Sequence, residues 1–314
     1  MKIFLLRRAL VLLPVMLLVS LFSFALIHMA PGDPAEILLT SPAGGADRAA
    51  VEDFRTKMGF DQPLPVQYLR WLGRAIQGDL GYSYMTGQPV CSAILASFES
   101  TLRLSLLSMV LSLLASIPLG IWSAMRPGSF PDHIGRWLAL LGVSVPNFWL
   151  AYLLILMFAI HLKWFPVAGY GNGGDLMHMV LPAIALGAAS ASVTIRLMRS
   201  SMLDVLQQDY IIAARAKGLG GWQVALGHAM KNALIPVATI SGLNFGYMLN
   251  GSVVVETIFA WPGIGGLVVS SIYQRDYPMI QGVTLFVALL FLSINLLVDL
   301  FYAVLNPGIR YERE

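Results

Sequence analysis

Six long runs of the sequence contain no Asp, Glu, Lys or Arg, and more polar segments separate them. An α-helix rises about 1.5 Å per residue, so about 20 apolar residues cross the roughly 30 Å hydrocarbon core of a bilayer. Every run reaches this length, and each is predicted to be a membrane-spanning helix. The predicted spans cover residues 9–30, 104–125, 137–160, 176–195, 232–255 and 277–298.

The first run also has to be compared with a secretory signal peptide, because Lys2, Arg7 and Arg8 precede it. Signal peptides have apolar regions of about 7–15 residues, followed by a small-residue cleavage site. This run has 22 residues (from 9 to 30), and no convincing cleavage site follows it. The pattern favours a membrane anchor that is retained.

Composition supports the membrane assignment and excludes other classes of protein. Hydrophobic residues make up 57% of the 314 residues and charged residues 12%, against about 45–50% and about 25% in soluble domains. These values exclude an ordinary soluble enzyme, a disordered chain and a disulfide scaffold. A formal net charge of +3 is too small to indicate a nucleic-acid partner, and the single cysteine, Cys91, allows no internal disulfide.

The distribution of basic residues predicts the orientation, because cytoplasmic loops of membrane proteins are enriched in Lys and Arg. With six spans and both termini in the cytoplasm, the short outer loops hold only Lys163 and Arg275. Five spans would place a strongly basic segment outside. The sequence therefore predicts an all-α membrane protein with cytoplasmic N and C termini. The inner basic residues are Lys2, Arg7, Arg8, Arg126, Arg136, Arg196, Arg199, Arg215, Lys217, Lys231, Arg310 and Arg313.

The segment 31–100 differs from the rest, because it carries 13 of the 37 charged side chains (20 basic plus 17 acidic). Its apolar residues recur at helical spacing in 51–58 and in 66–76, and Gly78 is placed to end the second helix. This pattern predicts a small extracytoplasmic helical cap. A loop with amphipathic pieces resting on the bilayer surface is an equally good interpretation.

The inner loop between the fourth and fifth spans has no span of its own, yet it has helical character. Residues 200–217 are good helix formers that include Ala213 and Ala214, and Gly218 follows as a stop. Residues 222–234 are predicted to form a second helix that leads into the membrane. Small alanine side chains on such a projection would let its backbone enter a groove of another protein. A surface helix that touches lipid headgroups is the alternative.

Motifs for catalysis and metal binding are absent from the sequence. It has no H-E-x-x-H, no G-x-S-x-G and no P-loop, and the histidines lack the spacing of metal ligands. Gly169, Gly171 and Gly174 match G-x-G-x-x-G, but no strand precedes them, so they are interpreted as a turn. The sequence predicts no catalytic residue and no metal site.

Several polar residues lie within or beside the apolar runs. Asp299 has long apolar sequence on both sides, and an ionisable residue in a membrane is a functional candidate by default; anchoring against an inner-loop arginine is the plainer interpretation. Asn147 and Asn244 place amides at membrane depth, where they bind a polar solute or bridge two helices. Glu256 flanks the outer end of the fifth span, where a pore mouth or an interfacial anchor is expected.

Short motifs occur along nearly the whole chain. They are 31–34 (PGDP), 144–149 (SVPNFW), 209–219 (DYIIAARAKGL), 231–236 (KNALIP), 254–263 (VVETIFAWPG), 275–278 (RDYP) and 306–307 (NP). Together they resemble the inner-membrane permease subunits of ABC-type importers, in the dipeptide, oligopeptide and nickel branch. The resemblance departs from the general importer pattern at Ile212, where that pattern has a glutamate before the two alanines.

The resemblance implies a function as well as a fold. The chain would be a transport subunit and no enzyme, in a bacterial-type inner membrane, forming half of a path for peptides or glutathione-like solutes; nickel or metal chelates are the alternative. It would bind no cofactor, since ATP and Mg²⁺ would lie on partner subunits. Its partners would be a second, homologous permease in a heterodimer, two ATP-binding subunits, an extracytoplasmic solute-binding protein and membrane lipid.

The resemblance also implies which residues act. The loop that couples to the ATP-binding subunits would contain Asp209, Tyr210, Ala213, Ala214, Arg215, Lys217, Gly218 and Leu219. Candidates for the translocation path are Ser144, Asn147, Asn244, Glu256 and Asp299. A passive channel or secondary transporter would have no use for the inner projection. A polytopic membrane enzyme would need paired acids or a nucleophile and base at membrane depth.

The expected organisation has four parts. Residues 1–30 form the cytoplasmic N-terminus and first span, and 31–100 form the extracytoplasmic cap. The permease core covers 101–306 and includes the coupling loop at 199–232, and a cytoplasmic tail covers 307–314.

Overall fold

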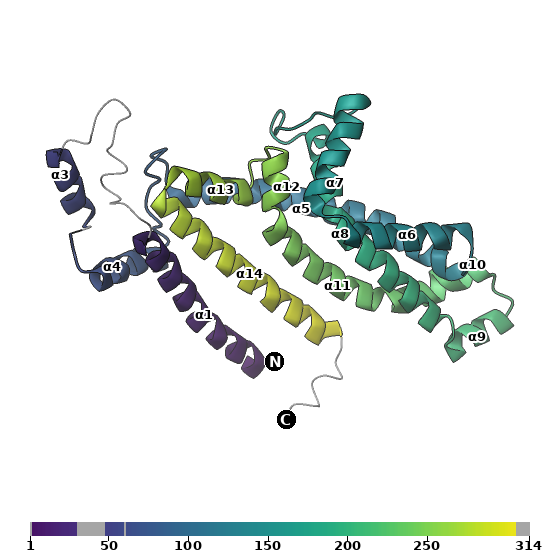
Figure 1. Ribbon diagram of the computed structural model, residues 1–314. Helices are drawn as coiled ribbons and strands as arrows, with labels where there is room; N and C mark the ends of the chain where they lie inside the picture. Colours follow the sequence, from purple (N-terminus) through teal and green to yellow (C-terminus); the bar gives the residue numbers. More distant parts are fainter. Residues whose placement is uncertain (1, 30–47, 60, 306–314) are drawn as a thin grey trace. The chain divides into compact units, whose positions relative to one another are not determined.

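The protein is mostly helical in the part that the computed structural model describes, which is residues 2–29, 48–59 and 61–305 (Figure 1). The chain divides into two compact units. The first unit contains Met1–Ser97 and Leu267–Leu292, and the second contains Phe98–Gly266 and Ser293–Glu314. Each unit is described by itself below. The PGDP motif at 31–34 and the NP motif at 306–307 lie outside the described residues.

In the first unit, the predicted helices of the outer segment are confirmed. Helix α3 covers Arg48–Met58 and α4 covers Leu64–Ile76, and the backbone turns at Gly78 with a φ of +83°. The long helix α1, Lys2–Met29, packs on α4. Its Ser20 hydroxyl lies 2.8 Å from the Tyr68 hydroxyl, and the Phe24 ring lies edge-on to Tyr68 at 5.5 Å between centroids. These aromatic contacts therefore hold α4 against the C-terminal part of α1.

A tight turn, residues 82–89, follows α4 in the same unit. Tyr82 and Pro89 form an isolated antiparallel bridge, and the Ser83 N–H donates to the Gln88 carbonyl at 2.9 Å. The Ser83 hydroxyl donates to the buried carboxylate of Asp276 at 2.5 Å, and the Tyr84 N–H donates to the same carboxylate at 3.2 Å. Asp276 belongs to the RDYP motif, so this motif holds a turn almost two hundred residues earlier in the chain. Burial raises the pKa of the Tyr84 hydroxyl above its ordinary value.

The second unit contains most of the remaining helices. It is built from the larger part of α5 (Val90–Met125), from α6 (Phe130–Ser144), α7 (Asn147–Leu154) and α8 (Leu176–Val205), and from α11 (Met230–Gly251) and α12 (Val253–Ile258). Helix α8 packs on α6, α7 and α11, and α12 packs on α7. Helices α13 (Ile264–Gln274) and α14 (Tyr277–Leu305) pass from one unit to the other.

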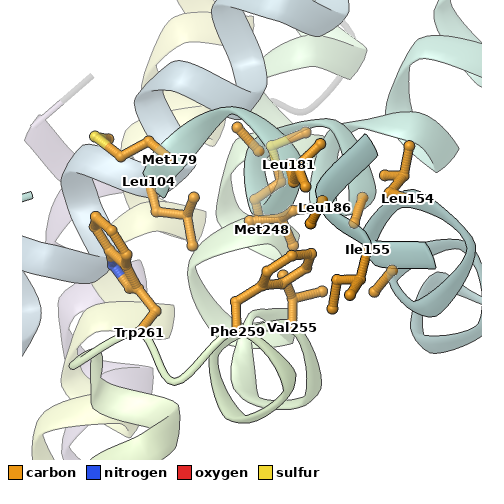
Figure 2. Packing of buried hydrophobic residues seen from close by; sticks show 14 residues of the cluster. Leu104, Leu154, Ile155, Met179, Leu181, Leu186, Met248, Val255, Phe259 and Trp261 are labelled. Atoms are coloured by element: carbon orange, nitrogen blue, oxygen red, sulfur yellow. The ribbon is translucent and has the colours of Figure 1, made fainter. Parts of the chain in front are cut away.

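Small residues allow these helices to approach closely. A Cβ added at Gly187 of α8 would lie 2.8 Å from the Ser108 carbonyl oxygen of α5, and one added at Gly120 would lie 2.7 Å from the Met198 Cβ. One buried apolar cluster surrounds Leu104, Met248 and Phe259 (Figure 2). A second cluster gathers around Met198 and Met202. Small residues within the fourth predicted span, such as Gly187, thus permit close helix packing.

The third predicted span is not one straight helix, which corrects the expectation for 137–160. Helices α6 and α7 meet at an angle of 110° around Val145 and Pro146, and a π-helical segment, Ile155–His161, continues α7. Pro146 has no N–H to donate, and the residue before a proline is biased away from helical conformations. Val145 is extended, with φ −87° and ψ 121°. The SVPNFW motif is therefore the site of the bend.

Three described helices are long and apolar enough to cross a membrane, namely 90–125, 176–205 and 277–297. The bent pair 130–144 and 147–161 is a fourth if it counts as one span. Shorter apolar helical stretches cover Leu12–Ala25 and Ile264–Gln274. The described residues therefore support a multi-pass helical protein, and the count of six spans stays a prediction.

Candidate functional site

The inner loop that the sequence singled out forms a short helix, α9, Asp209–Ala216, at one end of the second unit (Figure 1). Asp209 lies in its first turn and Arg215 in its last, so each charge complements the helix dipole. After Lys217 the chain turns at Gly218, with a φ of +83°, a conformation that glycine adopts without strain. The predicted stop is confirmed.

The predicted helix 200–217 is broken in the structure. Helix α8 continues to Val205, a turn covers 206–208, and Gln208 is extended before α9 begins. In one continuous helix, Ile211 would lie about 20 Å along the axis from Met198. The turn instead folds α9 back, so that Ile211 joins Met198 and Met202 in one buried cluster. Burial of the isoleucine side chain, worth roughly 1.5–3 kcal/mol, favours this arrangement.

The second predicted helix of the loop, 222–234, runs on into the membrane helix without a stop. Helix α10, Gly221–Val224, is followed by a π-helical segment, Ala225–Ala229, and then directly by α11. Val224, Ala225 and Ala229 are fully buried in the cluster around Met198. Helix α9 therefore packs on α10, and its buried residues share one cluster with residues of α5, α8 and α11.

The two faces of α9 differ in burial. Ile211 and Ala214 point inward and are 0% and 8% exposed. Of the eight residues predicted for the coupling loop, Ala214 alone is buried, and the other seven are exposed. The exposed predicted residues are Asp209, Tyr210, Ala213, Arg215, Lys217, Gly218 and Leu219. The exposed residues thus include small, basic and apolar side chains and the carboxylate of Asp209, and Ile212 is 57% exposed as well.

A hydrogen bond joins two of the sequence motifs. The Asn232 side-chain amide donates to the Tyr210 hydroxyl at 2.7 Å. Tyr210 belongs to the motif at 209–219 and Asn232 to the motif at 231–236. The two ends of the inner loop are therefore joined, because this bond attaches α9 to the first turn of α11.

The polar candidates for the translocation path do not form one hydrogen-bonded group in the described part of the chain. Ser144 is exposed at the end of α6, and Asn147 begins α7 just beyond the bend. The Asn244 amide donates to the Ser190 hydroxyl at 3.0 Å, so it bridges α11 and α8. Within the described part of the chain, no hydrogen bond joins any two of Ser144, Asn147, Asn244 and Glu256. The side chain of Asp299 lies outside the described residues.

Glu256 is fully buried, and both its carboxylate oxygens are occupied. Oε1 accepts from the Thr101 hydroxyl at 2.7 Å, and Oε2 accepts from the Gly265 and Gly266 N–H groups at 2.8 and 3.2 Å. The Thr101 oxygen in turn accepts from the Ile264 N–H at 2.9 Å. The first N–H groups of α13 are therefore bonded by side chains of α5 and α12, in place of a local N-cap.

Aromatic side chains pack together beside the same loop. The Trp261 indole N–H donates to the Ser100 carbonyl at 3.0 Å, and the Tyr170 ring lies edge-on to Trp261 at 4.6 Å. The Gly169 N–H donates to the Phe259 carbonyl at 2.8 Å. The glycine motif at 169–174 is a turn with positive φ values, as predicted, and it packs on the VVETIFAWPG motif.

Sequence reasoning missed two residues that organise these regions. Thr101 gives no signal in the sequence, because its partners lie more than 150 positions away. Asp132 was also missed. It forms an i,i+4 pair with Arg136, which the spacing alone would have revealed, and it also binds Arg199 on another helix.

Two family models cover almost the whole chain. Residues 116–311 match the binding-protein-dependent transport system inner membrane component, and residues 1–105 match the N-terminal part of the same kind of membrane component.

Curated relatives are similar over nearly their full length. The glutathione transport system permease protein GsiC of Salmonella paratyphi A is 43% identical over 309 residues, which is 98% of this chain and 99% of the relative. GsiC of Pectobacterium atrosepticum is 44% identical over 306 residues, 98% of each chain. GsiC of Escherichia coli K12 is 42% identical over 309 residues.

Solved structures share the fold. The MetNI methionine ABC transporter, in inward-facing conformations, has a TM-score of 0.54 at 16% identity, over 68% of this chain and 96% of that one. An amino acid ABC transporter has a TM-score of 0.52 at 15% identity, over 67% and 92%. The chain belongs to the family of inner-membrane components of binding-protein-dependent ABC transport systems, as a multi-pass transport subunit whose ATP hydrolysis takes place on separate subunits.

Proposed function

We propose that this permease takes up glutathione-like or other small peptides, and that α9 is the element through which ATP hydrolysis drives it. The observation that carries the coupling proposal is the two-sided burial of α9. Its inward residues Ile211 and Ala214 are buried in a cluster shared with α5, α8, α10 and α11, whereas Tyr210, Ile212 and Ala213 are exposed. A short helix that is packed on one side and exposed on the other is suited to docking on another protein.

The assembly that we propose is the one implied by the family. This chain would pair with a second, homologous permease, each supplying half of the path, and two ATP-binding subunits would hold ATP and Mg²⁺. An extracytoplasmic binding protein would deliver the solute. The topology would have six spans with both termini in the cytoplasm. Four would be the three long apolar helices and the bent pair of α6 and α7, and α1 and α11 would supply the other two.

Mechanically, closure of the ATP-binding subunits on ATP would displace α9, and the helices packed on it would tilt. Such a movement would expose the path alternately to the two sides of the membrane. This chain needs no nucleotide motif for that role, because the energy arrives through a contact.

The solute proposal rests on the relatives. Proteins 42–44% identical over nearly their whole length are named glutathione permeases. Glutathione is a tripeptide, which agrees with the peptide branch of the family. Nickel or metal chelates are the second candidate, since the resemblance includes nickel importers. Binding measurements on the cognate binding protein, with glutathione, a dipeptide panel and nickel chelates, would separate them; tight binding of a chelate and none of a peptide would overturn the peptide assignment.

The coupling proposal is tested by Ala213→Trp in the assembled transporter. Ala213 is exposed, so a large side chain there should leave the permease folded but prevent docking. We expect ATPase activity stimulated by the loaded binding protein to be abolished, and Ala213→Ser, which stays small, to keep it. Normal stimulation in Ala213→Trp would overturn the docking role of α9. Purification of the unmodified chain from its native membrane without any ATPase subunit would instead favour a passive channel or secondary transporter.

A further inference from the structure

A buried carboxylate lies where the turn between α5 and α6, the start of α6 and the end of α8 meet. The Asp132 side chain is 0% exposed. Its Oδ1 accepts from Arg199 Nε at 2.7 Å, and its Oδ2 accepts from Arg199 Nη2 at 3.2 Å. Oδ2 also accepts from Arg136 Nη2 at 2.6 Å and from the Gly128 N–H at 2.8 Å. The carboxylate is thus fully satisfied, and Arg199 holds both of its oxygens.

The two arginines have different structural roles. Arg136 lies one turn after Asp132 on the same helix, α6, and its side chain is 53% exposed. Arg199 lies near the end of α8, and its side chain is 26% exposed. Only the bond to Arg199 joins two different helices. The Gly128 N–H, which also donates to Asp132, belongs to the turn between α5 and α6. Asp132 therefore connects this turn to the end of α8.

The end of α8 is also the support of α9. Met198 and Met202, on either side of Arg199 in sequence, are fully buried in one cluster with Ile211 and Ala214 of α9. Ile121 and Ala124 of α5 belong to the same cluster. The backbones approach closely here, because Gly120 leaves no room for a Cβ beside Met198. The base of α9 and the start of α6 are therefore attached to the same segment of α8.

We infer that the Asp132–Arg199 pair is the joint through which a displacement of α9 reaches α6 and, beyond the bend at Pro146, α7. The inference rests on the proposed coupling function of α9. Apolar contacts let two helices slide, whereas a carboxylate held through both oxygens fixes distance and orientation together. Asp132 and Arg199 act as positioning residues, with no role in binding solute or nucleotide. Through their ion pair, the start of α6 and the end of α8 move as one body with α9.

The test uses the complete transporter reconstituted in lipid vesicles, with the loaded binding protein and ATP. Two variants remove the ion pair between α6 and α8. They are Arg199→Gln and Asp132→Asn, and the latter keeps the shape of the side chain and an acceptor for the Gly128 N–H. Arg136→Gln is the matched control, because it removes a partner of the same carboxylate without separating two helices. Arg196→Gln, an exposed arginine of α8, controls for the loss of inner positive charge. The readouts are ATPase subunits retained, ATPase stimulation by the binding protein, and solute transported per ATP.

We expect Arg199→Gln and Asp132→Asn to retain the ATPase subunits and to lose at least about fivefold in solute transported per ATP, the lower end of usual coupling between sites. Arg136→Gln and Arg196→Gln should keep the unmodified ratio. An unchanged ratio in both joint variants would overturn the inference, and so would an equal loss in Arg136→Gln, which would indicate a general need to compensate the buried charge. If Arg199→Gln lowers the yield of assembled transporter, Asp132→Asn alone decides by the same ratio.

Failure of the inference differs from failure of the proposed function. If the unmodified chain retains no ATPase subunit, or if Ala213→Trp remains fully stimulated, the coupling role of α9 is wrong. If both of those tests succeed while the joint variants stay coupled, only the role of the Asp132–Arg199 pair is wrong.

Discussion

The Thr101 hydroxyl oxygen lies 2.7 Å from Glu256 Oε1 and also accepts from the Ile264 N–H at 2.9 Å. One side chain of α5 thus bonds both the carboxylate of α12 and the start of α13. All of these groups are buried. The loop between α12 and α13 is therefore held by buried hydrogen bonds.

Thr101→Val should destabilise this loop, because it keeps the shape of the side chain but leaves an oxygen of Glu256 and the Ile264 N–H without a partner. A buried polar group that loses its partner costs about 1–3 kcal/mol. We expect a lower melting temperature of the purified chain in nanodiscs. The matched control is Thr257→Val, since Thr257 is exposed and its hydroxyl donates to the Val253 carbonyl of its own helix. Equal melting temperatures for the two variants would contradict the role of Thr101.

Gly187→Ala should separate α8 from α5. The new Cβ would lie 2.8 Å from the Ser108 carbonyl oxygen, and backbone atoms cannot rotate away as side chains do. Overpacking of this kind costs typically about 1–3 kcal/mol. Gly227→Ala is the control, because nothing lies within 4 Å of the Cβ it would add. Thermal unfolding should show a loss for the first variant and none for the second; the reverse order would rule out close packing of α5 and α8.

Asp276→Ala should loosen the turn at 82–89. It removes the acceptor of the Ser83 hydroxyl and of the Tyr84 N–H, while the bridge between Tyr82 and Pro89 remains. Amide hydrogen exchange of residues 83–88 should become faster, with α4 unaffected. Asp61→Ala, at an exposed position, provides the comparison. Unchanged protection of the turn in Asp276→Ala would show that the RDYP carboxylate does not hold it.

The start of α8 should respond to acid through Asp175. Hydrogen bonds from the His178 side chain, at 2.5 Å, and from the His178 N–H, at 3.0 Å, lower the pKa of this carboxyl below its ordinary value of 3.8. Because the folded-state pKa is the lower one, the contribution to stability is present above pH 3.8 and is lost as the pH falls through the lowered pKa. The difference in melting temperature between the unmodified chain and Asp175→Asn should therefore shrink on acidification below that value. A constant difference would exclude the carboxylate as its source.

Much of the fold was predictable because it depends on local pattern. The apolar runs predicted long helices, and α5, α8 and α14 follow from them. The helical spacing of the outer segment predicted α3 and α4, and the glycine stops at Gly78 and Gly218 were placed correctly. Each of these features involves neighbours in sequence, where hydrophobicity and backbone conformation decide the outcome.

The candidate site was predictable only in part, because burial of one helix face depends on distant residues. The motif identified the segment of α9, but the pattern did not show that Ala214 would be covered and Ala213 exposed. The break at 206–208 was missed for the same reason. It is contact with Met198 and Met202, on the preceding helix, that folds α9 back.

By itself the sequence determined that this protein is a helical membrane protein, and its motifs indicated the importer family and the segment of the inner loop that matters. Tertiary structure alone decided which charges meet. The sequence spacing of Asp132 and Arg136 fits an i,i+4 pair on a helix, yet Asp132 is fully buried and also binds Arg199, 67 positions away. Glu256 was a candidate for a pore mouth, yet its oxygens bond Thr101 and the start of α13. The physical reason is that hydrophobicity acts through local pattern, whereas a buried charge needs partners that only the folded chain brings within reach.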